Sequence, residues 1–179
     1  MGGTGTLISL DEYLNTSYEP DMDFVEGALV RRNTGTQRHG LLLSIVVSFF
    51  GQQEKSHRIR VFTAARLRID AQGRHRIPDV MVLEIPYKKG KVVVDAPAVV
   101  IEIKSPDDTF DNIVDRCFDY ERLSGGNIEV MDPDRKMAWS FREGSLQLLT
   151  GTSIGLNLPQ QQSSIDFPFA QLFAELDED

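Results

Sequence analysis

The stretch Ala98-Val-Val-Ile-Glu-Ile-Lys-Ser-Pro106 carries the pattern that decides the fold. Its first four residues form a short apolar run, which is typical of a strand buried on both faces in the middle of a sheet. The run Val80-Met-Val-Leu83 has the same character and follows Pro78 and Asp79 directly. Between the two runs, Lys88-Lys-Gly-Lys91 predicts an exposed turn. The segment therefore predicts two central strands of one sheet.

An amphipathic helix is expected after the second strand. Asp107 or Asp108 is expected to cap it, and Gly125-Gly126 to end it. Its apolar positions are 110, 113, 114, 117, 120 and 123. Cys117 lies among them and is the only cysteine, so no intrachain disulfide and no cysteine-built zinc site can form. We interpret it as a buried thiol rather than a nucleophile.

The residues before these strands predict further helices and strands. A short helix is expected over 10–15, and a strand with a turn or bulge at Gly27 over 23–30. Residues 39–53 have the apolar spacing of a buried helix face. Residues 61–70 alternate towards their end, which predicts a strand with one solvated face.

The chain after the amphipathic helix predicts strands again. Residues 128–131 and 137–141 are expected to be strands joined by the turn Asp132-Pro-Asp-Arg135, and 146–149 could pair back onto the second of them. This order of helices and strands favours an α/β fold with a mixed central β-sheet flanked by helices.

The composition is that of one globular domain. With 179 residues, 41% apolar and 26% charged, the chain can bury one ordinary core. No repeat or linker divides it, so we expect a single domain over 1–174 and a frayed acidic tail over 175–179. The longest apolar stretch, 40–51, is too short to cross a bilayer, and the first residues lack the basic start of a signal peptide. A cytoplasmic protein without membrane contact is therefore expected.

Charge is unevenly distributed along the chain. The net charge of −8 speaks against general affinity for nucleic acids. Residues 31–91, however, contain 13 Lys or Arg and only 4 Asp or Glu, whereas residues 105–179 contain 5 and 15. This split favours one basic face that could meet phosphate and one acidic face. Solvated charge runs without a ligand are the other interpretation, and both stay open.

Three polar residues in the deciding segments could do chemistry. Glu102 and Lys104 stand two apart on an expected strand, so both side chains point to one face while Ile103 points into the core. Asp79 opens the other strand. Two converging carboxylates with the Ile103 carbonyl and water suit Mg²⁺ or Mn²⁺, and a lysine beside them can stabilise charge on a phosphoryl group. A surface ion pair plus a turn aspartate is the alternative.

A longer succession of residues resembles the Uma-type ("Uma two") endonuclease family of the PD-(D/E)XK, restriction-endonuclease-like superfamily over about residues 10–142. It comprises Asp23-Phe-Val-Glu-Gly27, His39, Pro78-Asp79-Val80, Ala96-Pro97, Val100-Ile-Glu-Ile-Lys-Ser-Pro106, Arg116, Tyr120 and Met131-Asp-Pro133. The resemblance implies a restriction-endonuclease-like core and a metal site made by Asp23, Asp79 and Glu102. It also implies Mg²⁺- or Mn²⁺-dependent cleavage of DNA by a homodimer.

Some positions depart from the family pattern. Asp23 stands where the family usually has Glu and is one methylene shorter, so Glu26 could be the acid that reaches inward instead. Arg116 stands where a Lys is usual. Lys104, which many members lack, favours a working site.

The remaining candidates keep two interpretations each. His39 could contact phosphate or assist proton transfer, or could be a plain helix-terminal histidine. Arg116 could clamp a phosphate, or could pair with Asp119 or Asp115. Tyr120, one turn after Arg116, is expected in the core with its hydroxyl at the rim of the site.

Three functions follow from these residues. The first is a metal-dependent DNA endonuclease. The second is a catalytically inactive nucleic-acid-binding or assembly protein that retains the nuclease fold. The third is a purely structural dimer.

Overall fold

A mixed six-stranded sheet forms the centre of the computed structural model, which describes residues 7–32, 35–123 and 126–178. The strands are β3 (Ile59–Phe62), β6 (Val80–Glu84), β7 (Val99–Ile103), β8 (Asn127–Asp132), β9 (Met137–Arg142) and β10 (Ser145–Leu148). Their order in the sheet is β10-β9-β8-β7-β6-β3. β7 and β8 run parallel and the other neighbours antiparallel. The mixed central sheet and the two central strands β6 and β7 are as predicted.

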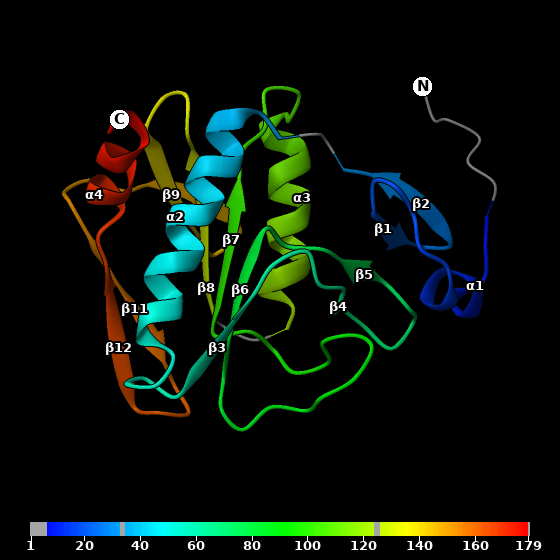
Figure 1. Ribbon diagram of the computed structural model, residues 1–179. Helices are drawn as coiled ribbons and strands as arrows, with labels where there is room; N and C mark the ends of the chain where they lie inside the picture. Colours follow the sequence, from blue (N-terminus) through cyan, green and yellow to red (C-terminus); the bar gives the residue numbers. More distant parts are fainter. Residues whose placement is uncertain (1–6, 33–34, 124–125, 179) are drawn as a thin grey trace.

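Helices cover both faces of this sheet (Figure 1). Every residue of β6 and β7 is buried, which explains their continuous apolar runs. α2 (Gln37–Gln53) packs on one face and α3 (Phe110–Glu121) on the other. Their buried residues include Leu42, Val46 and Phe50 of α2, and Ile113, Cys117 and Tyr120 of α3. The thiol of Cys117 is thus buried, as predicted. Within the described ranges, no helix combines the length and apolarity needed to cross a membrane.

The C-terminal residues extend the face that α2 covers. The hairpin of β11 (Ile154–Leu158) and β12 (Ser163–Phe167) and the helix α4 (Phe169–Ala174) pack into the same core as α2. The ring of Phe167 stacks on that of Phe50, with centroids 5.6 Å apart. These elements seal one side of the central strands from water.

The acidic end of the chain, expected as a frayed tail over 175–179, carries secondary structure in its described residues, and Asp179 lies outside them. Residues Glu175–Asp177 form the short 3₁₀ helix η1. Leu176 is buried in the core, and Asp177 forms ion pairs with Arg38 and Lys136. The buried Leu176 and the cations Arg38 and Lys136 therefore hold this segment in place. Its acidic composition alone had suggested a frayed tail.

A second, four-stranded sheet is formed mostly by the N-terminal residues, which follow the helix α1 (Leu10–Asn15). In spatial order its strands are β2 (Ala28–Arg31), β1 (Met22–Val25), β5 (His75–Arg76) and β4 (Leu67–Arg68). The single strand expected over 23–30 is a hairpin instead. Glu26 and Gly27 form its turn, with φ angles of 52° and 85°, because a two-residue turn between twisted strands requires positive φ.

Two other local predictions are wrong. Residues 61–70 do not form one strand, because β3 ends at Phe62 in the central sheet and β4 begins at Leu67 in the other one. α3 is capped by Thr109, whose hydroxyl accepts a hydrogen bond from the Asn112 N–H, and not by Asp107 or Asp108. The helix ends at Glu121, before the glycine pair, of which Gly125 lies outside the described residues.

Candidate active site

Asp79 and Glu102 line one small cavity of about 20 Å³, which has room for about one water molecule. The antiparallel pairing of β6 and β7 explains this convergence, because Val80 lies opposite Ile101. The start of one strand therefore lies beside the end of the other. The cavity is also lined by Arg32, His39, Ile103, Ser105, Asp108 and Arg116.

Asp79 is held by three groups. The backbone N–H of Ile103 donates a 2.8 Å hydrogen bond to Oδ2, and Arg32 Nη2 lies 2.6 Å from Oδ1. His39 Nε2 lies 3.5 Å from Oδ2. Burial alone would raise the pKa of Asp79, but the hydrogen bond from His39 and the charge of Arg32 outweigh it and lower the pKa. Asp79 is therefore an ionised carboxylate.

Glu102 points from β7 towards α3 and is 2% exposed. Oε1 accepts a 2.5 Å hydrogen bond from the Tyr120 hydroxyl, and Oε2 accepts a 3.0 Å bond from Arg116 Nε. Burial raises the pKa of Glu102, and the charge of Asp79 raises it further, although Arg116 acts in the opposite direction. The two carboxylates thus repel each other across the cavity, which is a setting that favours a cation.

Arg116 and Tyr120 both contact the candidate site from α3. Arg116 pairs with Glu102 and with Asp108, whose oxygen lies 3.3 Å from Arg116 Nη2. Of its two interpretations, the one that named Asp119 or Asp115 as partner is therefore wrong. The ring of Tyr120 is in the core and its hydroxyl reaches Glu102, as predicted. Burial and the nearby Glu102 raise the pKa of Tyr120, which keeps its hydroxyl a donor.

Asp23 and Glu26 do not line this cavity. Asp23 accepts 3.0 Å hydrogen bonds from the Ile77 N–H and from Arg76 Nη1, so both of its oxygens are engaged. Glu26 has an 80% exposed side chain and pairs with Arg74, so the prediction that it reaches inward is wrong. Its position in the positive-φ turn of the hairpin directs it to solvent.

Lys104 is not brought to the cavity either. The rule that residues two apart share a face holds only along a continuing strand, and β7 ends at Ile103. Lys104 Nζ donates instead to the Ser105 carbonyl oxygen at 3.1 Å. The cations that line the cavity are Arg32, Arg116 and, when protonated, His39.

Sequence reasoning missed Arg32, Ser105 and Asp108 as lining residues. The adjacent arginines at 31 and 32, at the end of the hairpin, were the available signal for Arg32. Ser105 and Asp108 form a turn in which Asp108 accepts a hydrogen bond from the Ser105 N–H, and a Ser-Pro-Asp sequence is typical of such a turn.

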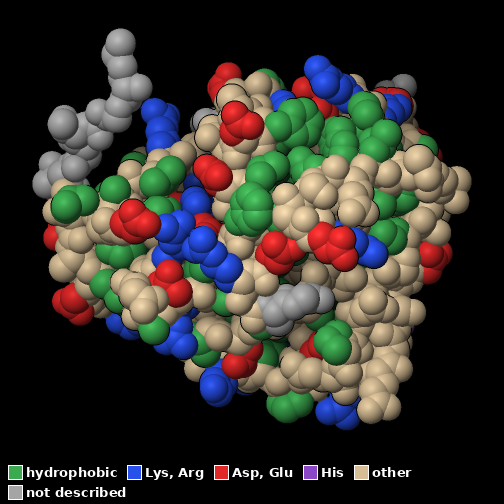
Figure 2. All heavy atoms as spheres, turned by 180° about the vertical axis from the view of Figure 1, so that it is seen from behind, with side chains coloured by type: hydrophobic (Ala, Val, Ile, Leu, Met, Phe, Trp, Pro, Cys, Tyr) green, Lys and Arg blue, Asp and Glu red, His purple; other side chains and the backbone are tan. Residues whose placement is uncertain are grey.

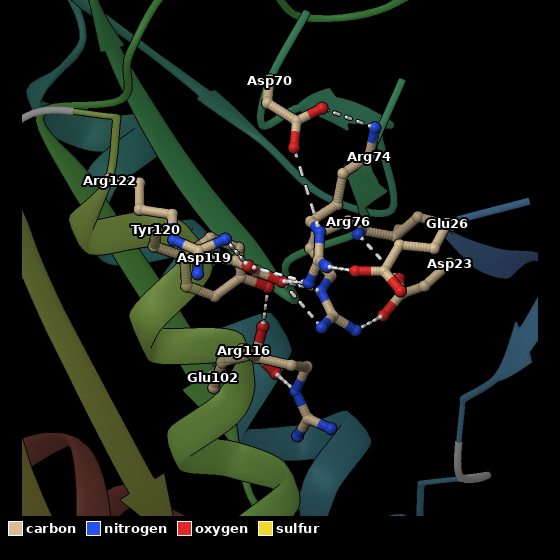
Figure 3. Close-up of polar contacts among 11 residues, drawn as sticks. Asp23, Glu26, Asp70, Arg74, Arg76, Glu102, Arg116, Asp119, Tyr120 and Arg122 are labelled. Atoms are coloured by element: carbon tan, nitrogen blue, oxygen red, sulfur yellow. Dashed lines mark hydrogen bonds and ion pairs between the residues drawn. The ribbon is translucent and has the colours of Figure 1, made fainter. Parts of the chain in front are cut away.

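An ion-pair network joins α3 to the N-terminal sheet. Asp119 is 1% exposed and accepts hydrogen bonds from Arg74, Arg76 and Arg122. Arg76 lies between Asp119 and Asp23, as Figure 3 shows. Figure 2 shows basic and acidic side chains intermingled near the boundary between the part that carries β1 and β2 and the rest of the protein. The network thus links α3 to β1 and β5, which carry Asp23 and Arg76.

The donor atoms at the cavity fit a hard divalent cation. Within the described ranges, no three His, Cys, Asp or Glu side chains lie together as a ready metal cluster. A metal would therefore take Asp79 and Glu102 with backbone oxygen and water, which is a usual arrangement for Mg²⁺. Each of the two carboxylates keeps lone pairs beyond its hydrogen bonds. Arg32 is the competing cation, because it contacts Asp79 Oδ1.

A family model described as "Putative restriction endonuclease" matches residues 10–168. No curated protein matches the chain.

Several solved chains match this one, and two of them are the following. The first is described as a "putative nuclease belonging to DUF820 from Anabaena variabilis". It has a TM-score of 0.78 and 22% identity, and the match covers 94% of this chain and 99% of that one. At this identity the match shows that the fold is shared. The second, a DrdV–DNA complex, has a TM-score of 0.37 and 13% identity, and the match covers 80% of this chain and 14% of that one.

Proposed function

This chain belongs to the Uma2 family, which is described as "Putative restriction endonuclease", and from that premise we propose that it is a metal-dependent endonuclease which hydrolyses DNA phosphodiester bonds at the cavity between Asp79 and Glu102. The observation that supports this most is the convergence of two buried carboxylates on one cavity. Burying two like charges together costs free energy unless cations or hydrogen bonds compensate. Here cations and hydrogen bonds compensate both carboxylates, and buried carboxylates with shifted pKa values at one cavity are a candidate for function.

We propose Asp79 and Glu102, with the Ile103 carbonyl and water, as ligands of Mg²⁺ or Mn²⁺. A bound ion of this kind polarises a phosphoryl oxygen and makes water a stronger nucleophile. The chain supplies rigid support for both ligands. Ile103 N–H holds Asp79, whereas Tyr120 and Arg116 hold Glu102.

In this proposal Arg116, and not Lys104, is the cation that acts on the phosphoryl group. Its guanidinium lies against Glu102 in the cavity, whereas Lys104 Nζ is bonded to a backbone carbonyl. Arg116 is placed to stabilise negative charge on a phosphoryl group. His39 is the second candidate for phosphate contact. Burial acts to lower the pKa of His39, but its hydrogen bond to Asp79 outweighs this and raises the pKa, which favours the charged ring.

One observation favours the second function, a nucleic-acid-binding or assembly protein without turnover. Arg32 and Arg116 already neutralise Asp79 and Glu102. If these pairs persist when metal and DNA are supplied, the cavity stays closed to a divalent ion. The family fold would then serve binding alone.

Two further parts of the proposal concern the polymer that is cut and the oligomeric state. DNA is proposed as the polymer because the family description names a restriction endonuclease. A homodimer is proposed because each chain offers one Asp79–Glu102 cavity and a duplex has two strands to cut.

The test is cleavage of plasmid and single-stranded DNA with Mg²⁺ or Mn²⁺, alongside calorimetric titration of the metals. We expect Asp79→Asn and Glu102→Gln, which keep side-chain shape, to lose cleavage at least about 100-fold. Lys104→Ala is the matched control and is expected to keep activity within about threefold. If the unaltered protein is folded or binds metal but cleaves no substrate, the second function, nucleic-acid binding or assembly without turnover, would be favoured. Loss of cleavage in Lys104→Ala would refute the assignment of the cationic role to Arg116.

A further inference from the structure

A second and larger cavity, of about 280 Å³, lies beside the Asp79–Glu102 cavity, between the β1–β2 hairpin and α3. The two cavities share Arg32, Asp108 and Arg116 in their walls, so they are contiguous. The size approaches the lower limit of small-ligand pockets, which leaves room for a phosphate with part of its sugar. Four arginines line it, at positions 31, 32, 76 and 116.

Two of these arginines are already committed to the protein. Arg76 bonds to Asp23 and Asp119, and Arg116 bonds to Glu102 and Asp108. Those pairs also neutralise Asp23 and Asp108, two of the acidic residues in the wall. Within this larger cavity, Arg76 and Arg116 therefore mainly neutralise the acidic residues of the wall. Arg116 also lines the smaller cavity, where the proposed function assigns it to the phosphoryl group that is cleaved.

The other two arginines keep donors for a ligand. Arg32 uses Nη2 to contact Asp79, and no other hydrogen bond of its guanidinium is found among the described residues. The exposed side chain of Arg31 has neither hydrogen bond nor ion pair with any described residue. Arg31 ends β2, the outer strand of its sheet, and Arg32 follows it directly. The hairpin thus presents two consecutive guanidinium groups at one cavity.

We propose that this cavity binds a phosphate of the nucleic acid strand next to the phosphate that is cleaved, with Arg31 and Arg32 as its ligands. The inference rests on the proposed function for the identity of the ligand. A guanidinium matches phosphate oxygens with paired donors, and it stays charged at every physiological pH. Arg32 lines both cavities and contacts Asp79. It would therefore lie between the neighbouring phosphate and the Asp79 carboxylate.

Substitution of Asp115 is expected to change DNA affinity in the opposite direction, towards tighter binding. It is exposed in the wall of the same cavity and has no ion pair among the residues that the structure describes. Its negative charge would repel a phosphate held by Arg31 and Arg32. Asp115→Asn is therefore expected to tighten binding a few-fold, at an exposed position where the fold tolerates change.

The experiment is fluorescence anisotropy of a labelled single-stranded DNA oligomer with EDTA present, so that binding is read without cleavage, over a range of KCl concentrations. The variant Arg31→Gln/Arg32→Gln is expected to bind roughly tenfold more weakly, with a salt slope smaller by about 0.7. The matched control, Arg135→Gln/Arg142→Gln, removes the same charge at exposed arginines outside both cavities. It is expected to change affinity by less than about twofold.

Arg31→Gln alone removes no hydrogen bond or ion pair to a described residue, and it keeps the test valid if the Arg32 change lowers the melting temperature. Equal losses in the site variant and the control would overturn the inference, and so would absence of DNA binding by the unaltered protein at low salt. The proposed cleavage can fail separately. In that case the unaltered protein would cut nothing with Mg²⁺ or Mn²⁺, while the site variant would still lose binding in EDTA.

Discussion

The hydroxyl of Tyr120 donates a 2.5 Å hydrogen bond to Oε1 of Glu102, across the interface between α3 and the central sheet. Glu102 is buried, and its other oxygen is held by Arg116. Tyr120 therefore fixes the direction in which this carboxylate meets the cavity. Groups that orient metal-binding side chains typically change metal affinity or activity 10- to 100-fold when removed.

Tyr120→Phe is expected to reduce DNA cleavage by about 10- to 100-fold. The substitution removes one oxygen and leaves the ring packing in place, so the carboxylate is freed without a cavity in the core. Cleavage rates and the melting temperature would be measured together. Tyr87→Phe, at a tyrosine whose ring pairs with Phe62 and which lines neither cavity, is the control and is expected to leave cleavage unchanged. Unchanged cleavage in Tyr120→Phe would refute the orienting role.

Asp119→Asn is expected to lower the free energy of unfolding by about 3 kcal/mol, because it leaves buried arginine charge without its partner. The carboxylate of Asp119 is the acceptor that Arg74, Arg76 and Arg122 share. Urea denaturation would measure the change. Asp166→Asn on the exposed side of β12 is expected to stay within about 0.5 kcal/mol. A similar value for both variants would show that the network does not hold the N-terminal sheet in place.

Gly126→Ala is expected to destabilise the protein by about 2 kcal/mol through crowding. A Cβ at this position would lie 2.6 Å from the Pro97 carbonyl oxygen and 3.3 Å from that of Ala98, where β8 joins β7. Both neighbours are backbone atoms and cannot rotate away. Gly155→Ala, whose Cβ would meet no atom within 4 Å, is the matched control. Equal unfolding midpoints for the two variants in urea would contradict the close approach.

Glu129→Gln is expected to stabilise the protein at pH 8 and to have little effect at pH 4. Burial raises the pKa of Glu129 from 4.5 to about 7, although the hydrogen bond from Ser140 acts in the opposite direction. The folded state therefore holds a proton that the unfolded state has lost between these two values. The unaltered protein loses stability as pH rises through that window, by roughly 3 kcal/mol, and then no further.

The Gln variant cannot titrate at position 129, so its advantage over the unaltered protein should grow from about pH 4.5 to about pH 7. Unfolding free energies at several pH values would show this. Glu143→Gln, at an exposed position in the β9–β10 turn, is the control for the same chemical change outside the core. A difference for Glu129→Gln that stays constant with pH would contradict the raised pKa.

The central strands and the main helices could be predicted from the sequence. β6 and β7 are apolar runs because both of their faces are covered, and α2 and α3 carry apolar residues at helical spacing. These are local patterns that a buried position imposes on consecutive residues. The same pattern placed Asp79 and Glu102 at the ends of neighbouring strands, where they do meet in one cavity. Tyr120 was correctly expected in the core with its hydroxyl at the site.

The charged partners could not be predicted, because they are set by contacts between distant residues. Arg32 and Asp79 are 47 positions apart, and Arg76 and Asp23 are 53 apart. Lys104 follows Glu102 by two residues and still leaves the cavity, since the strand ends between them.

The sequence by itself determined the central sheet, the helices that cover it and the positions of Asp79 and Glu102 on neighbouring strands. It could do so because burial imposes a regular pattern of apolar residues on consecutive positions. Only the tertiary structure decided which cations neutralise those carboxylates, and that Asp23 pairs with Arg76 outside the cavity that Asp79 and Glu102 line. Long charged side chains can reach many partners, and the packing of α3 against the N-terminal sheet selects among them.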